Sequence, residues 1–338
     1  MTFMRKFNTL LRNSDNKIYI LDSEDGINIS VYDMNFKLLS SKKIADGSFS
    51  FVDYWFDLTS SDQIYGIINN KIDSLIYIRI TDRLVVKSLL LKYDPETTFI
   101  KFITIKNLEN SSHIFYYKLD KLNSYAGTLI HNYKEGSTWH KSEIDSFSYN
   151  VLTNFVVTYD NDFLPTIFYY KLVNGFEEVF TSTFNKESCT WSDPIQITDS
   201  KKVKIYLSVI IDSKNFYHII FSENNFNKYY CNYIHGYISN NNFIITNNWK
   251  LSDTIACTFP NIIEANNIIY AHWIEYHSMY IRISDDYGST WSNTTICGTS
   301  SSIPFVCCNY HSNKNKYNTF NYFTLFVVNN SDKILGLE

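Results

Sequence analysis

Short runs of apolar and aromatic residues recur along the whole chain, and polar residues bound each run. Runs of this length, rich in Ile, Phe and Tyr, are typical of β-strands. Seven of them resemble one another and begin at intervals of 46 to 53 residues: Lys17–Asp22, Gln63–Asn69, His113–Lys118, Thr166–Lys171, His218–Asn224, Ala271–His277 and Phe323–Asn329. The pattern therefore predicts one type of strand that appears seven times in 338 residues.

Other apolar runs flank these copies. A strand precedes them, as at Phe51–Asp57, Phe99–Lys106, Val203–Asp212 and Ile303–Tyr310, and a third strand with a hairpin follows each copy except the last. The repeating unit is thus about four strands in about 50 residues, which is the size of a propeller blade. A four-stranded sheet cannot bury both of its faces alone, but stacking around an axis buries them.

We therefore predict an all-β fold: a seven-bladed β-propeller of four-stranded antiparallel blades, with a six-bladed ring as the alternative. Residues 1–338 are predicted to form a single domain, since no linker or low-complexity tract divides the chain. The last repeat, 303–338, lacks a fourth strand. We expect an N-terminal strand at 2–7 to join it and close the ring.

A tryptophan motif falls at the same period. Thr138-Trp139, Thr190-Trp191 and Thr290-Trp291 end three similar segments, with spacings of 52 and 100 residues between the tryptophans. The segment from Ser284 to Trp291 fits S-x-D-x-G-x-T-W at every fixed position, while 132–139 and 184–191 keep the Thr-Trp end and lose the Asp. The motif resembles the Asp box, or BNR repeat, of sialidase-like propellers, in which it forms the hairpin between the third and fourth strands of a blade.

The residue types of this motif indicate a structural role. A carboxylate at Asp286 can accept the backbone N–H groups that a hairpin turn leaves unpaired, and Gly288 can adopt a positive φ. A Trp at the end fills the space between sheets. The predicted structural residues are Ser284, Asp286, Gly288, Thr290, Trp291, Gly136, Thr138, Trp139, Thr190 and Trp191.

The arginine supply argues against sialidase chemistry. The resemblance implies three Arg that grip a substrate carboxylate, and an Arg-Ile-Pro-type motif near the N-terminus. This chain has five Arg, and its segment around Arg5 has no Pro. Arg79 and Arg282 fall in predicted third strands and Arg83 in a degenerate hairpin, so three convergent Arg are not expected.

Acidic and aromatic residues in the loops mark a candidate ligand face. The resemblance places this face opposite the Asp boxes. Its candidate residues are Asp25, Asp46, Tyr54, Trp55, Asp94, Glu96, Asp145, Asp253, Glu275 and His277. We predict a non-catalytic binding or scaffold module for a glycan or protein ligand. The alternative is a sialidase-like or other glycoside hydrolase with an atypical acidic site, which would need two carboxylates about 5–9.5 Å apart.

Composition and charge narrow the remaining classes of function and cellular location. The formal charge is −4 with no basic stripe, which argues against nucleic-acid binding. No run reaches the roughly 18 apolar residues of a membrane span, and the N-terminus lacks the apolar core of a signal peptide. We expect a cytoplasmic protein, with leaderless export or surface association as the alternatives. Six Cys without C-x-x-C spacing indicate free thiols, and we expect neither a metal nor a cofactor. The oligomeric state stays open.

Overall fold

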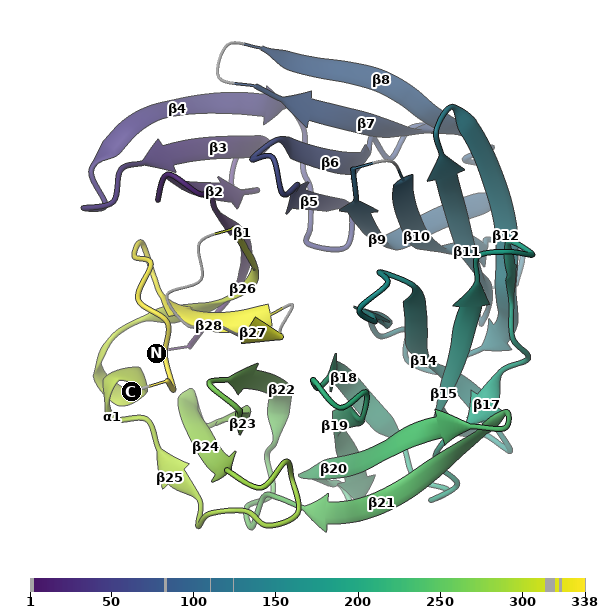
Figure 1. Ribbon diagram of the computed structural model, residues 1–338, viewed down its shortest axis with the longest axis vertical. Helices are drawn as coiled ribbons and strands as arrows, with labels where there is room; N and C mark the ends of the chain where they lie inside the picture. The colour runs from purple at the N-terminus through teal and green to yellow at the C-terminus, as the bar shows by residue number, and fades with distance from the viewer. Residues whose placement is uncertain are drawn as a thin grey trace. The chain divides into compact units, whose positions relative to one another are not determined.

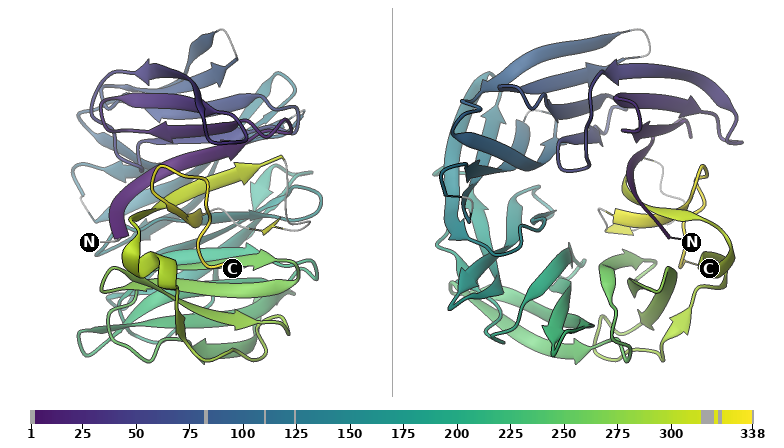
Figure 2. Two further views of the ribbon diagram at one scale, coloured as in Figure 1. Left: turned by 90° about the vertical axis from the view of Figure 1, so that its left-hand side faces the viewer. Right: turned by 180° about the vertical axis from the view of Figure 1, so that it is seen from behind.

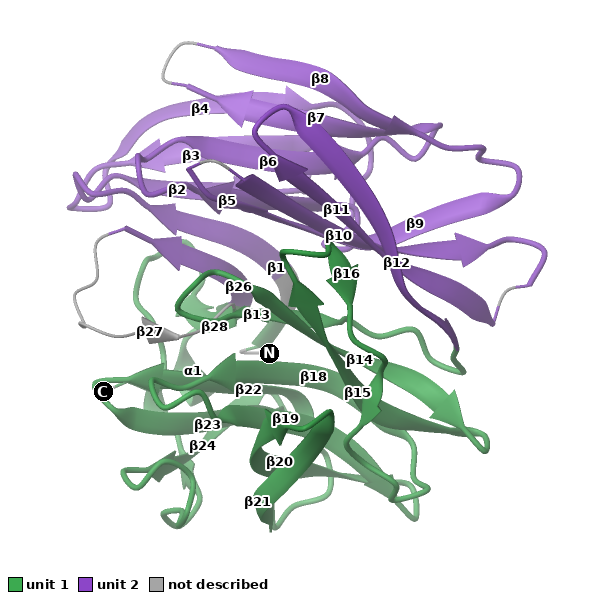
Figure 3. Ribbon diagram, turned by 45° about the vertical axis from the view of Figure 1, so that its right-hand side comes forward, with its two compact units in different colours: residues 1–5, 148–306, 315–338 green, residues 6–147, 307–314 purple. Residues whose placement is uncertain are grey.

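The computed structural model describes residues 3–81, 84–109, 111–123, 125–313, 320–321 and 324–337. The fold is all-β, with one short helix, α1 (Gly298–Ser302), in the described part of the chain. The chain forms two compact units: unit 1 contains residues 1–5, 148–306 and 315–338, and unit 2 contains residues 6–147 and 307–314 (Figure 3). The described residues contain no helix that could cross a bilayer.

Unit 2 carries three antiparallel runs of four strands, each in sequence order. The first has β1 (Phe3–Arg12), β2 (Ile18–Asp22), β3 (Ile27–Tyr32) and β4 (Leu38–Ala45), seen in purple in Figure 2. The second has β5 (Tyr54–Leu58), β6 (Ile64–Asn69), β7 (Ser74–Ile80) and β8 (Val85–Lys92). The third has β9 (Thr98–Asn107), β10 (Ser111–Asp120), β11 (Ala126–Glu135) and β12 (Thr138–Ser148). Strand β26 (Phe305–Ser312) lies next to β1 in the first sheet, whereas β28 (Thr324–Val328) belongs to unit 1.

Unit 1 repeats this arrangement (Figure 1). One sheet contains β13 (Val156–Tyr159), β14 (Pro165–Val173), β15 (Phe176–Asn185), β16 (Thr190–Trp191) and β17 (Ile195–Gln196). The next contains β18 (Lys204–Ile211), β19 (Tyr217–Asn225), β20 (Lys228–Ser239) and β21 (Asn242–Lys250). The last contains β22 (Thr258–Ala265), β23 (Ile268–Glu275), β24 (Ser278–Ser284) and β25 (Thr295–Ile296), and β27 (Phe320–Asn321) pairs with β22.

These sheets confirm the predicted all-β fold with several four-stranded antiparallel sheets. Six of the seven repeated runs are the second strands of their sheets, β2, β6, β10, β14, β19 and β23, and the seventh contains β28. The number of repeats in a ring stays a prediction. Within the predicted N-terminal strand at 2–7, Thr2 lies outside the described residues, and so does Phe323 of the seventh run.

Stacking of sheets buries both faces of β19, the second strand of the β18–β21 sheet. Ile219 and Ile220 are neighbours on β19 and are both fully buried, although successive side chains of a strand point to opposite faces. Ile219 packs in a cluster with Phe168 of β14, and Ile220 packs in another with Trp273 of β23. The apolar runs of the sequence are therefore almost continuous because water reaches neither face.

A five-residue turn recurs between the first and second strands of four sheets. Its first residue accepts, through its side chain, the backbone N–H of the fifth, and its fourth residue has a φ of 59° to 64°. The short polar side chain thus satisfies an amide that the turn leaves unpaired. The four copies, called the first-hairpin turns below, are Asn13–Lys17, Thr59–Gln63, Asp160–Leu164 and Asp212–Phe216.

Candidate functional site

The segment from Ser284 to Trp291 forms a turn after β24 that its own side chains hold. Asp286 accepts hydrogen bonds from the backbone N–H of Thr290 at 2.8 Å, from the Thr290 hydroxyl at 2.7 Å and from the Ser284 hydroxyl at 2.8 Å. These bonds, the Thr290 N–H first among them, hold the pKa of Asp286 below its usual value. Gly288 has a φ of 80° and donates its N–H to the Ser284 hydroxyl. The side chains of Ser284, Asp286 and Thr290 and the N–H groups of Gly288 and Thr290 are thus all hydrogen-bonded within the turn.

The motif tryptophans differ in their surroundings. Trp291 is half-buried and meets Tyr233 of β20 edge to face, with ring centroids 4.9 Å apart. Trp191 is half-buried against Phe184, with centroids 5.4 Å apart. Trp139 lies on β12 and is 42% exposed. Gly136, Thr138 and Thr190 lie at the turns and strand starts beside them.

The structure brings two residues of the candidate ligand face together. Lys43 of β4 forms ion pairs with Asp25 at 2.9 Å and with Asp46 at 3.3 Å, and both carboxylates are largely exposed. These hydrogen bonds raise the pKa of Lys43. The two acids therefore share one surface lysine, and such exposed pairs contribute little to stability.

Two aromatic residues of the candidate ligand face are core residues instead. Tyr54 is 3% exposed and packs in the cluster that contains Ile64 and Ile78, and burial raises its pKa to about 12. Trp55 is half-buried against the neighbouring cluster that contains Ile103 and Ile105. The Tyr54 ring is therefore not open on a surface where a sugar could stack on its face.

The other candidate acids are dispersed. Asp94 accepts the backbone N–H of Glu96 in the turn before β9. Asp145 is half-buried on β12. Asp253 is exposed and pairs with Arg282 at 2.9 Å.

Glu275 and His277 differ in their exposure to solvent. Glu275 is 1% exposed and accepts the indole N–H of Trp273 at 2.6 Å. His277 is exposed in the β23–β24 turn with a φ of 69°. Arg79, for its part, lies 6.0 Å from the Tyr65 ring, while Arg83 and the Arg5 side chain are outside the described residues.

A cavity of about 280 Å³ opens in unit 1 beside two of the first-hairpin turns. Its rim is polar, and its inner wall contains Tyr217, which is 7% exposed and donates its hydroxyl to Thr166 at 3.2 Å. None of the ten candidate ligand-face residues lines it. The residues that line it are Asp160, Asn161, Asp162, Ile211, Asn215, Tyr217 and Ile238.

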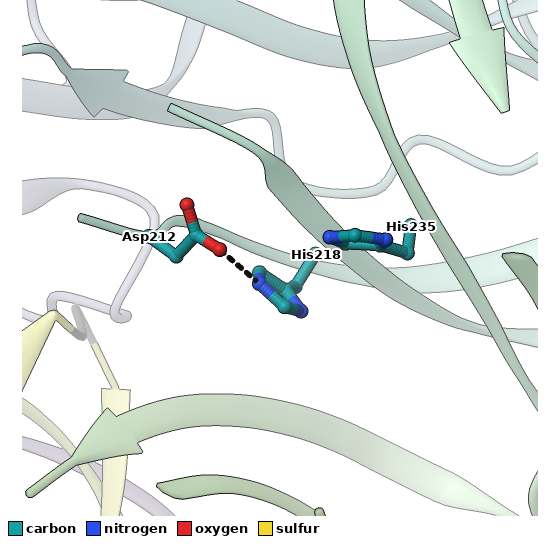
Figure 4. A group of neighbouring side chains, drawn as sticks. All are labelled: Asp212, His218 and His235. Atoms are coloured by element: carbon teal, nitrogen blue, oxygen red, sulfur yellow. Dashed lines mark hydrogen bonds and ion pairs between the residues drawn. The ribbon is translucent and has the colours of Figure 1, made fainter. Parts of the chain in front are cut away.

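Behind the Asp212–Phe216 turn lies a buried polar cluster. Asp212 follows β18, His218 lies on β19 and His235 on β20, and one donor atom from each lies within 4.8 Å of the others (Figure 4). His218 Nε2 is 3.2 Å from Asp212 Oδ2, and His218 Nδ1 is 2.8 Å from the Tyr233 hydroxyl. His235 Nδ1 is 2.6 Å from the Thr246 hydroxyl, and its Nε2 has no hydrogen-bond partner.

Electrostatics keep the two imidazoles of this cluster neutral and the carboxyl group charged. Burial lowers the pKa of His218, although Asp212 opposes the shift. Burial, with help from His218, lowers the pKa of His235 to about 4. Desolvation acts to raise the pKa of Asp212, but hydrogen bonds from His218 and from the backbone N–H groups of Phe216 and Lys214 outweigh it, so the pKa is lowered.

One more polar group interacts electrostatically with the same cluster from the next sheet. Glu264 is the last residue but one of β22, is 3% exposed, and its Oε1 has no hydrogen-bond partner. Desolvation, with a smaller contribution from the Asp212 charge, raises its pKa to about 6. Buried carboxyl groups without a partner are uncommon and point to a site of interaction.

Sequence reasoning singled out neither the cavity nor this cluster. His218 was expected to be a strand residue of the repeat, which it is, whereas Asp160 and Asp212 were not among the candidate site residues. A signal did exist: the two aspartates are 52 residues apart, which is one period, and each precedes a β-strand by the same number of residues. That regularity marks equivalent turns, but not which of them border a cavity.

Comparison with known proteins supports the fold. No protein-family model and no curated protein sequence matches the chain. Among solved structures, an ulvan lyase of polysaccharide lyase family PL25, bound to -[GlcA(1-4)Rha3S]-, is similar to this chain. The TM-score is 0.63 and the identity 10%, and the alignment covers 100% of this chain and 94% of the lyase chain. The polysaccharide lyase Uly1 is similar with a TM-score of 0.60 and 10% identity over 98% of this chain and 90% of its own.

An α-L-arabinanase of Penicillium chrysogenum complexed with arabinobiose is also similar, with a TM-score of 0.51 and 9% identity over 81% of this chain and 92% of its own. These neighbours are propeller-like proteins, which agrees with a propeller-like β fold for this chain. At such low identity the similarity speaks for the fold and not for an activity.

Proposed function

We propose that this protein binds a glycan in the cavity between the Asp160–Leu164 and Asp212–Phe216 turns. The observation that carries the proposal is the cavity itself: about 280 Å³ of space with carboxylate and amide groups at its rim and an aromatic ring in its wall. Its volume is near the lower end of ligand pockets and fits a group of monosaccharide size. The carbohydrate-active structural neighbours support the same class of ligand.

The lining groups match the two surfaces of a sugar. Asp162, Asn161 and Asn215 offer acceptors and donors for hydroxyl groups. Tyr217 and Ile238 offer an apolar wall for the C–H face of a ring. Two carboxylates line this cavity and no basic side chain does. We therefore expect a neutral, hydroxyl-rich glycan rather than a sulfated or uronate-containing one.

The role that we propose is binding without catalysis. Asp160 Oδ1 accepts the backbone N–H groups of Asp162 and Leu164, so this carboxylate holds its turn. A glycoside hydrolase remains the alternative, because Asp160 and Asp162 line one cavity and glycosidases use a pair of carboxyl groups. A protein ligand is the second alternative, and no feature of the cavity favours it.

We further propose that the repeated sheets are blades of an Asp-box β-propeller with seven blades in one domain. The hydrogen bonds of Asp286 and the positive φ of Gly288 support an Asp-box turn. The position of β26 next to β1 supports closure by the N-terminal strand. Deletion of residues 2–7 should then abolish cooperative unfolding, whereas an open array of sheets would tolerate it.

The binding proposal is tested by glycan-array screening followed by calorimetry with the best neutral ligand. Asp162→Asn should weaken binding about tenfold, the equivalent of one charge-assisted hydrogen bond. Asp15→Asn is the matched control, since it is the same substitution at the same position of the Asn13–Lys17 turn. Equal affinities of the two variants, or binding only of anionic glycans, would overturn the assignment to this cavity.

Glycosidase assays on the same wild-type and variant proteins distinguish binding from hydrolysis. The wild-type protein should release no product from a panel of fluorogenic glycosides. Turnover that Asp160→Asn or Asp162→Asn abolishes would establish the hydrolase instead.

A further inference from the structure

The buried cluster behind the Asp212–Phe216 turn has the donor set and the geometry of a metal site. Its Asp212 and His218 donors are already 3.2 Å apart, close to the separation of about 3.3 Å between two ligands on a tetrahedral zinc ion. His235 brings a third donor within 4.8 Å of both. We propose that Asp212, His218 and His235 bind one Zn²⁺ ion.

The unpartnered atom in the cluster is the second, independent sign of a ligand. His235 is 8% exposed, and its Nε2 has no hydrogen-bond partner, while the ring is stacked on Phe216 with centroids 4.9 Å apart. A buried polar atom in this state is costly unless something binds it. A metal ion that the cluster shares would satisfy this nitrogen.

The outer contacts of both histidines are those of metal ligands. The Thr246 hydroxyl is 2.6 Å from His235 Nδ1, and the Tyr233 hydroxyl is 2.8 Å from His218 Nδ1. Each imidazole is thus held at Nδ1, while His218 Nε2 lies beside Asp212 Oδ2 and His235 Nε2 has no hydrogen-bond partner. Ligating histidines usually have their second nitrogen fixed in this way.

The chemical nature of the three ligands indicates which metal ion the cluster would bind. Two imidazoles with one carboxylate suit Zn²⁺ and similar transition metals, whereas Ca²⁺ and Mg²⁺ prefer oxygen ligands alone. Glu264 is a further carboxyl group that interacts with Asp212, and its buried Oε1 offers a fourth ligand or a partner for a bound water. Lys214 is a nearby cation, and its ammonium group lies over the Tyr287 ring, 3.7 Å from the ring centroid.

The proposal is independent of glycan binding and is tested on the full chain. Chelator-treated protein is titrated with ZnCl₂, CaCl₂ and MgCl₂ by calorimetry, and bound metal is measured by mass spectrometry. We expect one Zn²⁺ per chain with a dissociation constant in the micromolar range or below, and at least a hundredfold weaker binding of Ca²⁺ and Mg²⁺. A wild-type protein that takes up no Zn²⁺ would overturn the proposal.

Variants assign the ion to this cluster. His235→Asn should weaken Zn²⁺ binding at least tenfold, and Thr246→Val should weaken it less. His113→Asn is the matched control, because His113 is a buried histidine near the start of β10, as His218 is of β19. Equal loss in the His113 and His235 variants would place the ion elsewhere.

A spectroscopic measurement on the wild type keeps the test independent of variant folding. Co²⁺-loaded protein should show the visible bands of a four- or five-coordinate site without a sulfur-to-cobalt charge-transfer band. Such a band would assign the ion to cysteines, for which the buried Cys231 and Cys257 are the candidates, and would contradict the proposal.

Discussion

The Tyr233 ring meets the Trp291 ring edge to face, with centroids 4.9 Å apart, while the hydroxyl of the same tyrosine lies 2.8 Å from His218 Nδ1. The tyrosine thus joins the motif turn of one sheet to the polar cluster of its neighbour. Both contacts lie within unit 1. The contact with the Tyr233 ring makes Trp291 a packing residue, so its removal should lower the stability of the fold.

Trp291→Ala should lower the free energy of unfolding by about 3 kcal/mol, because it removes a large half-buried ring and leaves a cavity beside Tyr233. Trp139→Ala is the matched control at the equivalent motif position, and it should cost less because Trp139 is 42% exposed. Urea unfolding measures both. Equal losses would contradict the packing role assigned to Trp291.

Asp286→Ala should destabilise the protein by about 1–2 kcal/mol, since it leaves the Thr290 N–H and two hydroxyl groups without their acceptor. The neighbouring Asp285 is exposed, so Asp285→Ala should change the stability by less than about 0.5 kcal/mol. Thermal unfolding of the pair measures the difference. A ligand role for Asp286 would instead predict lost binding at unchanged stability.

Asp57 on β5 should make unit 2 sensitive to acid. Desolvation acts to raise its pKa, but Lys106 and His311, whose nitrogens lie 3.4 Å and 2.6 Å from its oxygens, hold the pKa well below the ordinary value. A carboxyl group with a depressed folded-state pKa contributes stability above its unfolded pKa of about 3.9, and loses that contribution as the pH falls further.

Asp57→Asn should therefore cost about 3 kcal/mol at pH 7 and flatten the fall in stability below about pH 4. Denaturant midpoints of the wild type and the variant between pH 7 and pH 2 measure this. Parallel pH profiles would show that other carboxylates, such as the Asp53 group paired with Lys71 and Lys101, carry the acid sensitivity.

Removal of Zn²⁺ should weaken glycan binding several-fold if both proposed sites exist. Asp212 and Asn215 belong to one five-residue turn, and Asp212 lies in the cluster while Asn215 lines the cavity. An ion on Asp212 would fix the turn and lower the ordering cost of binding. Calorimetry with the glycan before and after chelation measures the change. An unchanged affinity would show that the two sites are uncoupled.

The repeated strands were predictable from the sequence because their physical cause is local. Each apolar run, from the one that contains β2 to the one that contains β23, must bury its side chains, and the turns between runs need short polar residues or a positive φ. The motif around Asp286 was predictable for the same reason, since Ser284 and Thr290, which donate to its carboxylate, lie within four residues of it.

The candidate sites depended on tertiary structure because their members are far apart in sequence. Asp160 and Asn215 line one cavity only after β13–β14 and β18–β19 pack together, and Glu264 interacts with Asp212 only after two sheets stack. Tertiary structure also buries Glu275, a residue that the sequence placed on the candidate ligand face. Its sequence context resembles that of an exposed loop acid, but the register of β23 buries it beside Trp273. A repeat in sequence makes many positions locally equivalent, and only the packing between sheets makes a few of them different.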